Sequence, residues 1–341
     1  MLHFDSDYME GAHPKIIEKL IQTNLVQSSG YGSDDYCAMA REKIKAACNT
    51  PDADVFFLVG GTQTNATVID ALLSPWEGVV AAGTGHIAVH EAGAVEATGH
   101  KVITIPDNGG KITPKALGDY LAAFHADQSK DHMVYPGAVY ISHPTEKGTL
   151  YTADELSSLY KICREYDIPL FLDGARLGYA LVTDGNDIDL PFIAKNTDVF
   201  YIGGTKVGAL FGEAVVVPKG GRLKHFTTMI KRHGGLLAKG RLLGLQFDAL
   251  FTDNLYFEIS RHGVEMAKKL ENGFVSRGYT MMYGAHSNQK FVLMENRDIK
   301  RLRQNATFED WEVIDKDHTV VRFVTSWATR EEDLEKLISL L

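Results

Sequence analysis

The sequence predicts an α/β protein in which a mostly parallel β-sheet is covered by helices and is followed by a small C-terminal α+β domain. Apolar strand-like runs alternate with helix-like patterns over most of the chain, an order that builds parallel sheets. A long helix-like stretch at 253–277 interrupts this alternation, and a strand-like run follows at 320–325. The 341 residues, 45% of them hydrophobic, are enough to fill one large and one smaller core.

Seven strand-like runs define the expected sheet. They lie at 54–59, 78–82, 101–105, 138–142, 169–173, 199–202 and 214–217. Between them, helices are expected at 66–73, from about residue 86, and after Thr152, which forms a capping box with Glu155.

We expect three segments in the chain. Residues 1–15 form an N-terminal arm that contributes to the active site, 16–250 form the large cofactor-binding domain, and 251–341 form the small domain. The change of domain is placed where the alternating pattern gives way to the long helix.

Composition and charge narrow the classes of partner. The formal net charge is −9, from 35 Lys and Arg against 44 Asp and Glu, which argues against a nucleic-acid partner and favours a small-molecule substrate. No apolar run approaches the ~20 residues that a membrane span needs. The three cysteines cannot all pair and the first residues lack a signal-peptide pattern, so we expect a cytoplasmic protein.

Asp173 and Lys206 carry the strongest chemical signal. Asp173 ends one strand-like run, and Lys206 follows the next run after Gly203-Gly204-Thr205, so a carboxylate and an amine are expected at neighbouring strand ends. A buried aspartate can keep a pyridine nitrogen protonated, and a lysine amine can bind an aldehyde covalently. Together they match the needs of a pyridoxal phosphate (PLP) site. The alternative is a salt-bridged strand end followed by a glycine turn.

The segment Gly60-Gly61-Thr62 follows a strand-like run and opens a helix. Exposed backbone N–H groups and the helix dipole favour an anion at such a place, which makes it a candidate phosphate cup. It matches neither a Walker A loop nor a Gly-x-Gly-x-x-Gly dinucleotide turn. A simple glycine turn is the alternative.

His86 and His90 offer a competing interpretation. Their spacing would place two imidazoles on one helix face, as in zinc sites, but Glu91 follows the second histidine and the His-Glu-x-x-His pattern is absent. In a PLP site, one of these histidines could instead stack on the pyridine ring.

The chain resembles the low-specificity L-threonine aldolases, members of the aspartate-aminotransferase-like, fold-type I PLP enzymes. The resemblance covers nearly the whole chain. Its motifs are Ser6-Asp7, Tyr31-Gly32-Ser33-Asp34-Asp35, Gly61-Thr62-Gln63-Thr64-Asn65, His86-Ile87, Glu91-Ala92-Gly93-Ala94, Leu172-Asp173-Gly174-Ala175-Arg176, Thr205-Lys206-Val207-Gly208, Arg232-His233-Gly234-Gly235 and Val321-Arg322-Phe323-Val324-Thr325. Each is short, but their shared order is specific.

The resemblance implies roles for individual residues around the cofactor. Lys206 matches the lysine that binds the cofactor, Asp173 the partner of the pyridine nitrogen, and His86 the histidine stacked on its ring. The positions implied on the phosphate side are Gly61, Thr62 and Thr205.

The resemblance also implies substrate-binding and catalytic groups. Arg176 matches an arginine near the phenolic oxygen of the cofactor and the substrate carboxylate, while Ser6 and Arg322 match the remaining carboxylate-binding groups. His132 lies close to the position of a second family histidine. The general base is left open between His86, His132 and an ordered water.

Arg232 and Lys239 match basic residues that reach the phosphate from a neighbouring subunit, in the opposite order. The resemblance thus implies a homodimer or homotetramer with shared active sites. Whether a structural monovalent cation is bound is left open.

The implied reaction is cleavage of L-threonine, L-allo-threonine and related β-hydroxy-α-amino acids to glycine and acetaldehyde or the corresponding aldehyde, in threonine catabolism and glycine biosynthesis. The chain departs from the family in reading His143-Pro144-Thr145-Glu146-Lys147 where typical members have Glu-Asn-Thr-His, and Asp5 and Tyr8 where Arg and Thr are usual. The alternatives are another fold-type I PLP enzyme, such as a β-eliminating lyase, phenylserine-type aldolase or aminotransferase, and, more distantly, a zinc hydrolase using His86 and His90.

Overall fold

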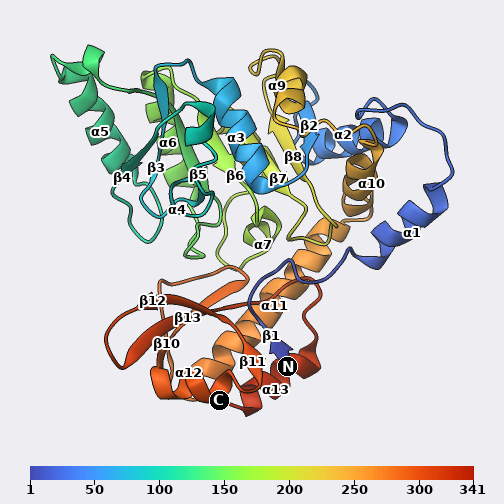
Figure 1. Ribbon diagram of the computed structural model, residues 1–341, viewed down its shortest axis with the longest axis vertical. Helices are drawn as coiled ribbons and strands as arrows, with labels where there is room; N and C mark the ends of the chain where they lie inside the picture. Colours follow the sequence, from blue (N-terminus) through green and yellow to red (C-terminus); the bar gives the residue numbers. More distant parts are fainter.

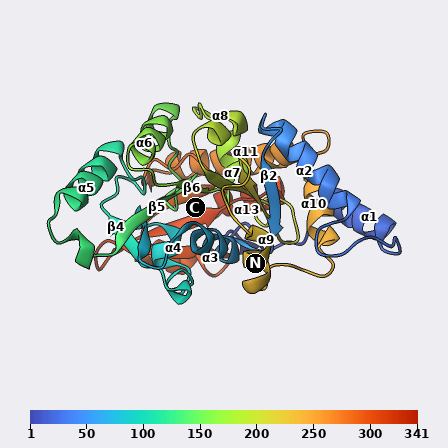
Figure 2. The same ribbon diagram turned by 90° about the horizontal axis from the view of Figure 1, so that it is seen from above.

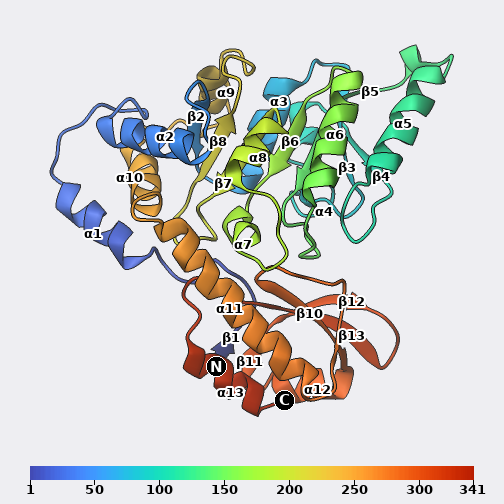
Figure 3. The same ribbon diagram turned by 180° about the vertical axis from the view of Figure 1, so that it is seen from behind.

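The computed structural model describes residues 1–341 as a large and a small domain connected by the long helix α11, Leu255–Val275 (Figure 1). Viewed from behind, this helix runs from the large domain along the small one (Figure 3). None of the helices combines the length and apolar character that a membrane crossing requires.

The large domain is organised around a seven-stranded sheet in the order β2-β8-β7-β6-β5-β3-β4. Its strands are β2 Asp54–Leu58, β3 Glu77–Ala82, β4 Val102–Ile105, β5 Tyr135–Ser142, β6 Leu170–Asp173, β7 Val199–Gly203 and β8 Glu213–Val217. All pairs are parallel except those of β8, which runs antiparallel to both β7 and β2. The predicted strands therefore form one mostly parallel sheet, in which β8 begins where its neighbours end.

Helices cover both faces of this sheet (Figure 2). One face carries α3 Gly61–Leu72, α4 His86–Val89 and α9 Phe226–Arg232. The other carries α2 Asp35–Ala47, α5 Pro114–Ala126, α6 Ala153–Glu165, α8 Leu190–Lys195 and α10 Arg241–Leu250. The sheet strands are apolar on both sides because both faces are buried, as expected for a parallel sheet.

The remaining elements before α11 are α1 Pro14–Thr23, α7 Leu177–Leu181 and the 3₁₀ turns η1 Glu96–Thr98 and η2 Lys130–His132. The capping box predicted at Thr152 is present at the start of α6, where both of its hydrogen bonds form. The helix expected from residue 86 is only four residues long, because the chain turns out of it at His90 and Ala92 adopts a positive φ of 51°.

The small domain holds a four-stranded antiparallel sheet in the order β12-β13-β10-β9. Its elements after α11 are β9 Thr280–Met281, β10 Gln289–Glu295, α12 Asn296–Leu302, β11 Ala306–Thr307, β12 Glu309–Val313, β13 His318–Val324 and α13 Glu331–Ser339. The N-terminal strand β1, Leu2–His3, pairs with β11, and Phe4 is buried in the core of this domain. The first residues are thus fixed to the small domain before the chain passes to the large one.

Candidate active site

The carboxyl ends of the parallel strands meet at the edge of the sheet that faces the small domain. His86 follows β3, Asp173 ends β6 and Lys206 follows β7, so three side chains far apart in sequence converge there. They line two adjoining cavities of about 50 and 450 Å³ that share Lys206, Arg176 and His86 in their walls. The larger cavity is closed on its other side by Trp311 and Arg322 of the small domain.

Asp173 is almost completely buried and has hydrogen-bond donors on both carboxylate oxygens. Oδ1 accepts from the Tyr201 hydroxyl at 2.5 Å and from the Ala175 N–H at 2.9 Å, while Oδ2 accepts from the Tyr140 hydroxyl at 2.6 Å and from Asn65 Nδ2 at 2.9 Å. Burial raises the pKa of Asp173, but His86 and the two tyrosine hydroxyls outweigh it and bring the pKa below its ordinary value. The carboxylate is therefore held ionised, as a partner for a cation must be.

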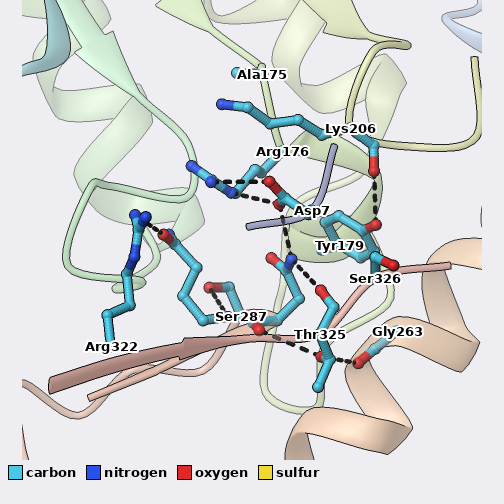
Figure 4. A network of polar contacts seen from close by, with 12 residues as sticks. Asp7, Ala175, Arg176, Tyr179, Lys206, Gly263, Ser287, Arg322, Thr325 and Ser326 are labelled. Carbon is cyan, nitrogen blue, oxygen red and sulfur yellow. Dashed lines mark hydrogen bonds and ion pairs between the residues drawn. The ribbon is translucent and has the colours of Figure 1, made fainter. Parts of the chain in front are cut away.

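Lys206 extends its amine into the same cavity, over Arg176 (Figure 4). Its backbone carbonyl accepts a hydrogen bond of 2.7 Å from the Tyr179 hydroxyl, which fixes the turn after β7. Burial and the charge of Arg176 lower the pKa of the Lys206 amine. A lysine with a lowered pKa holds more of the neutral, nucleophilic form near neutral pH.

His86 is oriented by a chain of polar contacts. Its Nδ1 lies 2.7 Å from Glu91 Oε1, and Asn65 Nδ2 donates both to that oxygen at 2.7 Å and to Asp173. The Glu91 side chain has no exposed area, while the His86 side chain is 34% exposed. The imidazole is thereby fixed in the cavity wall beside Asp173.

The glycine segment after β2 opens the cavity at the N-terminus of α3. The helix begins at Gly61 after Gly60, and no side chain caps it, which leaves its first N–H groups available to an anion. A Cβ at residue 61 would stand 3.3 Å from the Tyr201 hydroxyl, so glycine there keeps the approach to Asp173 open. Thr62 and Thr205 also line this part of the cavity.

Glu213 lies on the same side because β8 runs antiparallel and starts at this edge. Its Oε1 accepts from the Thr205 hydroxyl at 2.8 Å and its Oε2 from the Gly204 N–H at 3.1 Å. Burial raises the pKa of Glu213 to about 8. Burial thus favours the protonated form of this carboxyl, which would lessen its charge repulsion toward a phosphate bound beside Thr205.

Arg176 is held by the N-terminal arm (Figure 4). Its Nε and Nη2 donate to Asp7 at 2.7 and 3.0 Å, and Asp7 also accepts from Asn288 Nδ2 at 2.9 Å. Asp7 has no exposed side-chain area. The arm thus ties an arginine of the large domain to a loop of the small domain at the cavity floor.

Arg322, on β13, faces Arg176 from the small domain. It donates from Nη1 to Gln289 Oε1 at 3.0 Å, forms an ion pair with Glu309 through Nη2, and lies over the Trp311 ring at 5.2 Å. Its Nε is buried without a partner. The guanidinium thus lines the cavity with both of its Nη groups paired inside the small domain.

Four residues predicted for the site do not line these cavities. Ser6 is half-buried in the arm next to Asp7. His132, predicted to be catalytic, is exposed in η2, which precedes β5, so it lies at the amino end of that strand and away from the cavities of its own chain. Arg232 and Lys239 are exposed, and Arg232 pairs with Asp70 of its own chain at 3.3 Å.

The histidine pair considered for zinc does not form a metal cluster. The two rings lie 5.7 Å apart, His86 is paired with Glu91, and no group of three or more His, Cys, Asp and Glu side chains in the chain is placed to hold a metal ion.

Asp7, Glu146 and Glu213 were not among the site residues predicted from the sequence. Asp7 belongs to the Ser6-Asp7 motif, and Glu146 to the segment that departs from the family pattern, so both had a signal. Glu213 had none, because its position depends on the direction of β8.

The residues present fit PLP. An amine and a buried, ionised carboxylate face one cavity, and an uncapped helix N-terminus lies at its side. These are the groups required at the aldehyde, the pyridine nitrogen and the phosphate of that cofactor.

Comparisons with known proteins agree with this geometry. The sequence profile of the beta-eliminating lyase family matches residues 3–324. A low specificity L-threonine aldolase from Pseudomonas sp. (strain NCIMB 10558) is 29% identical over 339 residues, which cover 98% of this chain and 95% of that protein.

Solved structures show the same relationship. A threonine aldolase of Leishmania major superposes with a TM-score of 0.96 at 42% identity, covering 100% of this chain and 98% of that one. An aspartate aminotransferase from Thermus thermophilus has a TM-score of 0.71 at 16% identity, covers 100% and 90% of the two chains, and shares the fold. The chain therefore belongs to the beta-eliminating lyase family, among the PLP-dependent lyases that include the threonine aldolases.

Proposed function

We propose that this enzyme cleaves L-threonine, L-allo-threonine and related β-hydroxy-α-amino acids to glycine and acetaldehyde or the corresponding aldehyde. The observation that carries the proposal is the placement of Lys206 and Arg176 in the walls of two adjoining cavities, of which the smaller is also lined by Asp173 and the larger by Arg322. Together the two cavities have groups for a cofactor and, beside them, arginines for an amino-acid carboxylate.

Three residues of the chain would bind the cofactor. Lys206 would bind the cofactor through its amine, Asp173 would hold a proton on the pyridine nitrogen, and His86 would lie against the ring. When bound, PLP supplies an electron sink for the pair left when the Cα–Cβ bond of the substrate breaks.

The two arginines would bind and orient the substrate carboxylate. Arg176 keeps Nη1 without a hydrogen-bond partner in the chain while Asp7 accepts from its other donors, and the substrate carboxylate would compete with Glu309 for Arg322. Holding the carboxylate at two points would fix rotation about the Cα–N bond and so select which bond at Cα lies across the ring. Orientation of this kind lowers the activation barrier, because the rotational entropy of the substrate is lost on binding and not in the chemical step.

We further propose a homodimer or homotetramer in which Arg232 and Lys239 reach the phosphate of an adjacent protomer. Both side chains are exposed, and the region around α1 presents apolar residues to solvent, among them Ile21 at 72% and Leu25 at 92% exposure. A patch of this kind favours association with a second copy. We also propose a cytoplasmic enzyme of threonine catabolism and glycine biosynthesis, in keeping with its three unpaired cysteines.

An aldehyde-release assay tests the reaction. The purified, PLP-loaded enzyme is given L-threonine, L-allo-threonine, both D isomers and phenylserine, and aldehyde and glycine are measured. We expect equal amounts of aldehyde and glycine from the L substrates. Ammonia or an α-keto acid as the main product would instead identify a β-eliminating lyase or an aminotransferase.

A further inference from the structure

Glu146 is an acidic residue in the walls of both cavities. It lies on the loop after β5 and lines both cavities together with His86, Arg176 and Lys206. Its Oε1 accepts from the backbone N–H of His86 at 2.8 Å and from the Ser142 hydroxyl at 2.7 Å. Its Oε2 makes no hydrogen bond within the chain, so one oxygen is anchored and the other is available to a ligand.

The surroundings of Glu146 make it a stronger base than an ordinary glutamate. Burial raises its pKa, and the nearby Asp173 charge raises it further, while the Ser142 hydrogen bond and His86 act in the opposite direction. The net pKa lies above the ordinary value. The titratable and charged groups that face it are His86, Tyr140, Tyr151, Asp173, Arg176 and Lys206.

The other acidic groups of the cavity wall are committed elsewhere. Asp173 and Glu213 have hydrogen-bond donors on both oxygens. The free oxygen of Glu91 is buried out of reach of a ligand, and its other oxygen holds His86. Glu309 is paired with Arg322 on the small-domain side.

His86 and His132 are less suited than Glu146 to accept a proton from the substrate. His86 has its Nδ1 bound by Glu91, and the resemblance places its ring against the cofactor. His132 lies on the surface at the far end of β5.

We infer that Glu146 is the group that takes the proton from the substrate β-hydroxyl, with Oε2 as the accepting atom. This inference rests on the proposed function. The O–H bond breaks with its proton passing to Glu146, the O–H electron pair becomes the second C–O bond of the aldehyde, and the Cα–Cβ bond breaks with its pair retained on the Cα side. In the reverse direction the protonated carboxyl returns the proton to the aldehyde oxygen.

The test compares Glu146→Gln and Glu146→Asp with two controls in the PLP-loaded enzyme. Glu91→Gln alters the other glutamate that contacts His86, and Glu165→Gln alters an exposed glutamate at the end of α6. Three quantities are measured: cleavage of L-threonine, the Kd of glycine by calorimetry, and the infrared carbonyl band of protonated carboxyls as a function of pH. Glycine has no β-hydroxyl, and the infrared band reports protonation without turnover.

We expect Glu146→Gln to lower kcat for L-threonine by about 10²–10⁴-fold, the usual contribution of a general base. Its glycine Kd should stay within about threefold of wild type, since carboxylate binding uses the two arginines. One titrating infrared band should be missing in Glu146→Gln and kept in Glu91→Gln and Glu165→Gln. Glu146→Asp should retain part of the activity, because the carboxylate is shortened and not removed.

Three results would overturn the inference. They are a kcat for Glu146→Gln within about fivefold of wild type, a parallel loss of glycine binding or of the visible cofactor band, and a full set of infrared bands in the variant. The second result would instead assign Glu146 to cofactor binding. If Glu146→Gln does not fold, Glu146→Asp decides by the same criteria, with a shifted acid limb of kcat/KM expected and an unchanged profile contradicting the role. A wild-type enzyme that binds glycine and yet releases no aldehyde would overturn the proposed function itself.

Discussion

Replacing Asp7 by Asn should destabilise the fold and disturb the cavity together. Asp7 accepts two hydrogen bonds from Arg176 and one from Asn288, and its side chain is completely buried. An asparagine of the same shape offers one acceptor oxygen, and its NH₂ group would face an N–H donor of Arg176 or Asn288. Arg176 would keep a buried charge near Lys206 and Arg322 with its main counter-charge gone.

The size of the effect follows from this burial. Removing one partner of a buried ion pair costs about 3–5 kcal/mol, since the remaining charge stays buried without compensation. Typical domains unfold with about 5–15 kcal/mol, so the loss is a large part of the total. Because the Asp7 charge also raises the pKa of Lys206, its removal should lower that amine pKa further.

Denaturant unfolding at fixed protein concentration measures the change, with far-UV circular dichroism as the readout. The matched control is Asp5→Asn, two residues away in the arm, where a partly exposed carboxylate contacts His3 and Thr307. The control should lose less than about 1 kcal/mol. If Asp7→Asn is as stable as Asp5→Asn or wild type, Asp7 is not the buried counter-charge on which the arm depends.

The pH dependence gives a second check on Asp7. Burial raises its pKa, but Arg176 and Lys206 outweigh burial and bring it below 3.8. A carboxylate with a lowered folded-state pKa stabilises the protein fully above its unfolded pKa and loses this contribution as pH falls through the folded value. The stability difference between wild type and Asp7→Asn should therefore be constant from neutral pH to about pH 5 and shrink below about pH 4.

Three further predictions concern the cofactor, the substrate and the assembly. Lys206→Ala should lose turnover and covalent cofactor attachment, and borohydride reduction with peptide mapping should place the cofactor on Lys206 in wild type; a label on another lysine contradicts the assignment. Glu309→Gln should tighten glycine binding by about 2- to 5-fold in calorimetry, because a partly exposed ion pair worth ~0.3–1 kcal/mol no longer competes for Arg322. The control Glu312→Gln, on the same strand, should leave glycine binding unchanged. Mixing Lys206→Ala with Arg232→Glu should restore about a quarter of wild-type activity, because half of the exchanged dimers are hybrids and each hybrid has one intact site of two. Inactivity in verified hybrids argues against shared sites.

The sequence was sufficient for those features that depend on local pattern. The strand-like runs ending at Asp173 and preceding Lys206 correspond to β6 and β7, and the capping box at Thr152 starts α6 as expected. Alternation of strands and helices gives parallel neighbours, and parallel strands place their carboxyl ends on one edge. For this reason the order of strands and helices in the sequence is enough to place the amine, the carboxylate and the glycine turn at one edge of the sheet.

Only the tertiary structure could decide the features that depend on strand direction and on distant packing. Glu213 enters the cavity because β8 is antiparallel, and Asp7 meets Arg176 because the arm is fixed by the pairing of β1 with β11. His132 precedes β5 and so lies at the amino end of that strand, and the expectation for it came from the resemblance and not from its place in the chain order. The sequence by itself determined which chemical groups this protein has at its strand ends. The fold decided which of these groups face one another, because hydrogen bonds and ion pairs between residues more than a hundred positions apart leave no periodic trace in the chain.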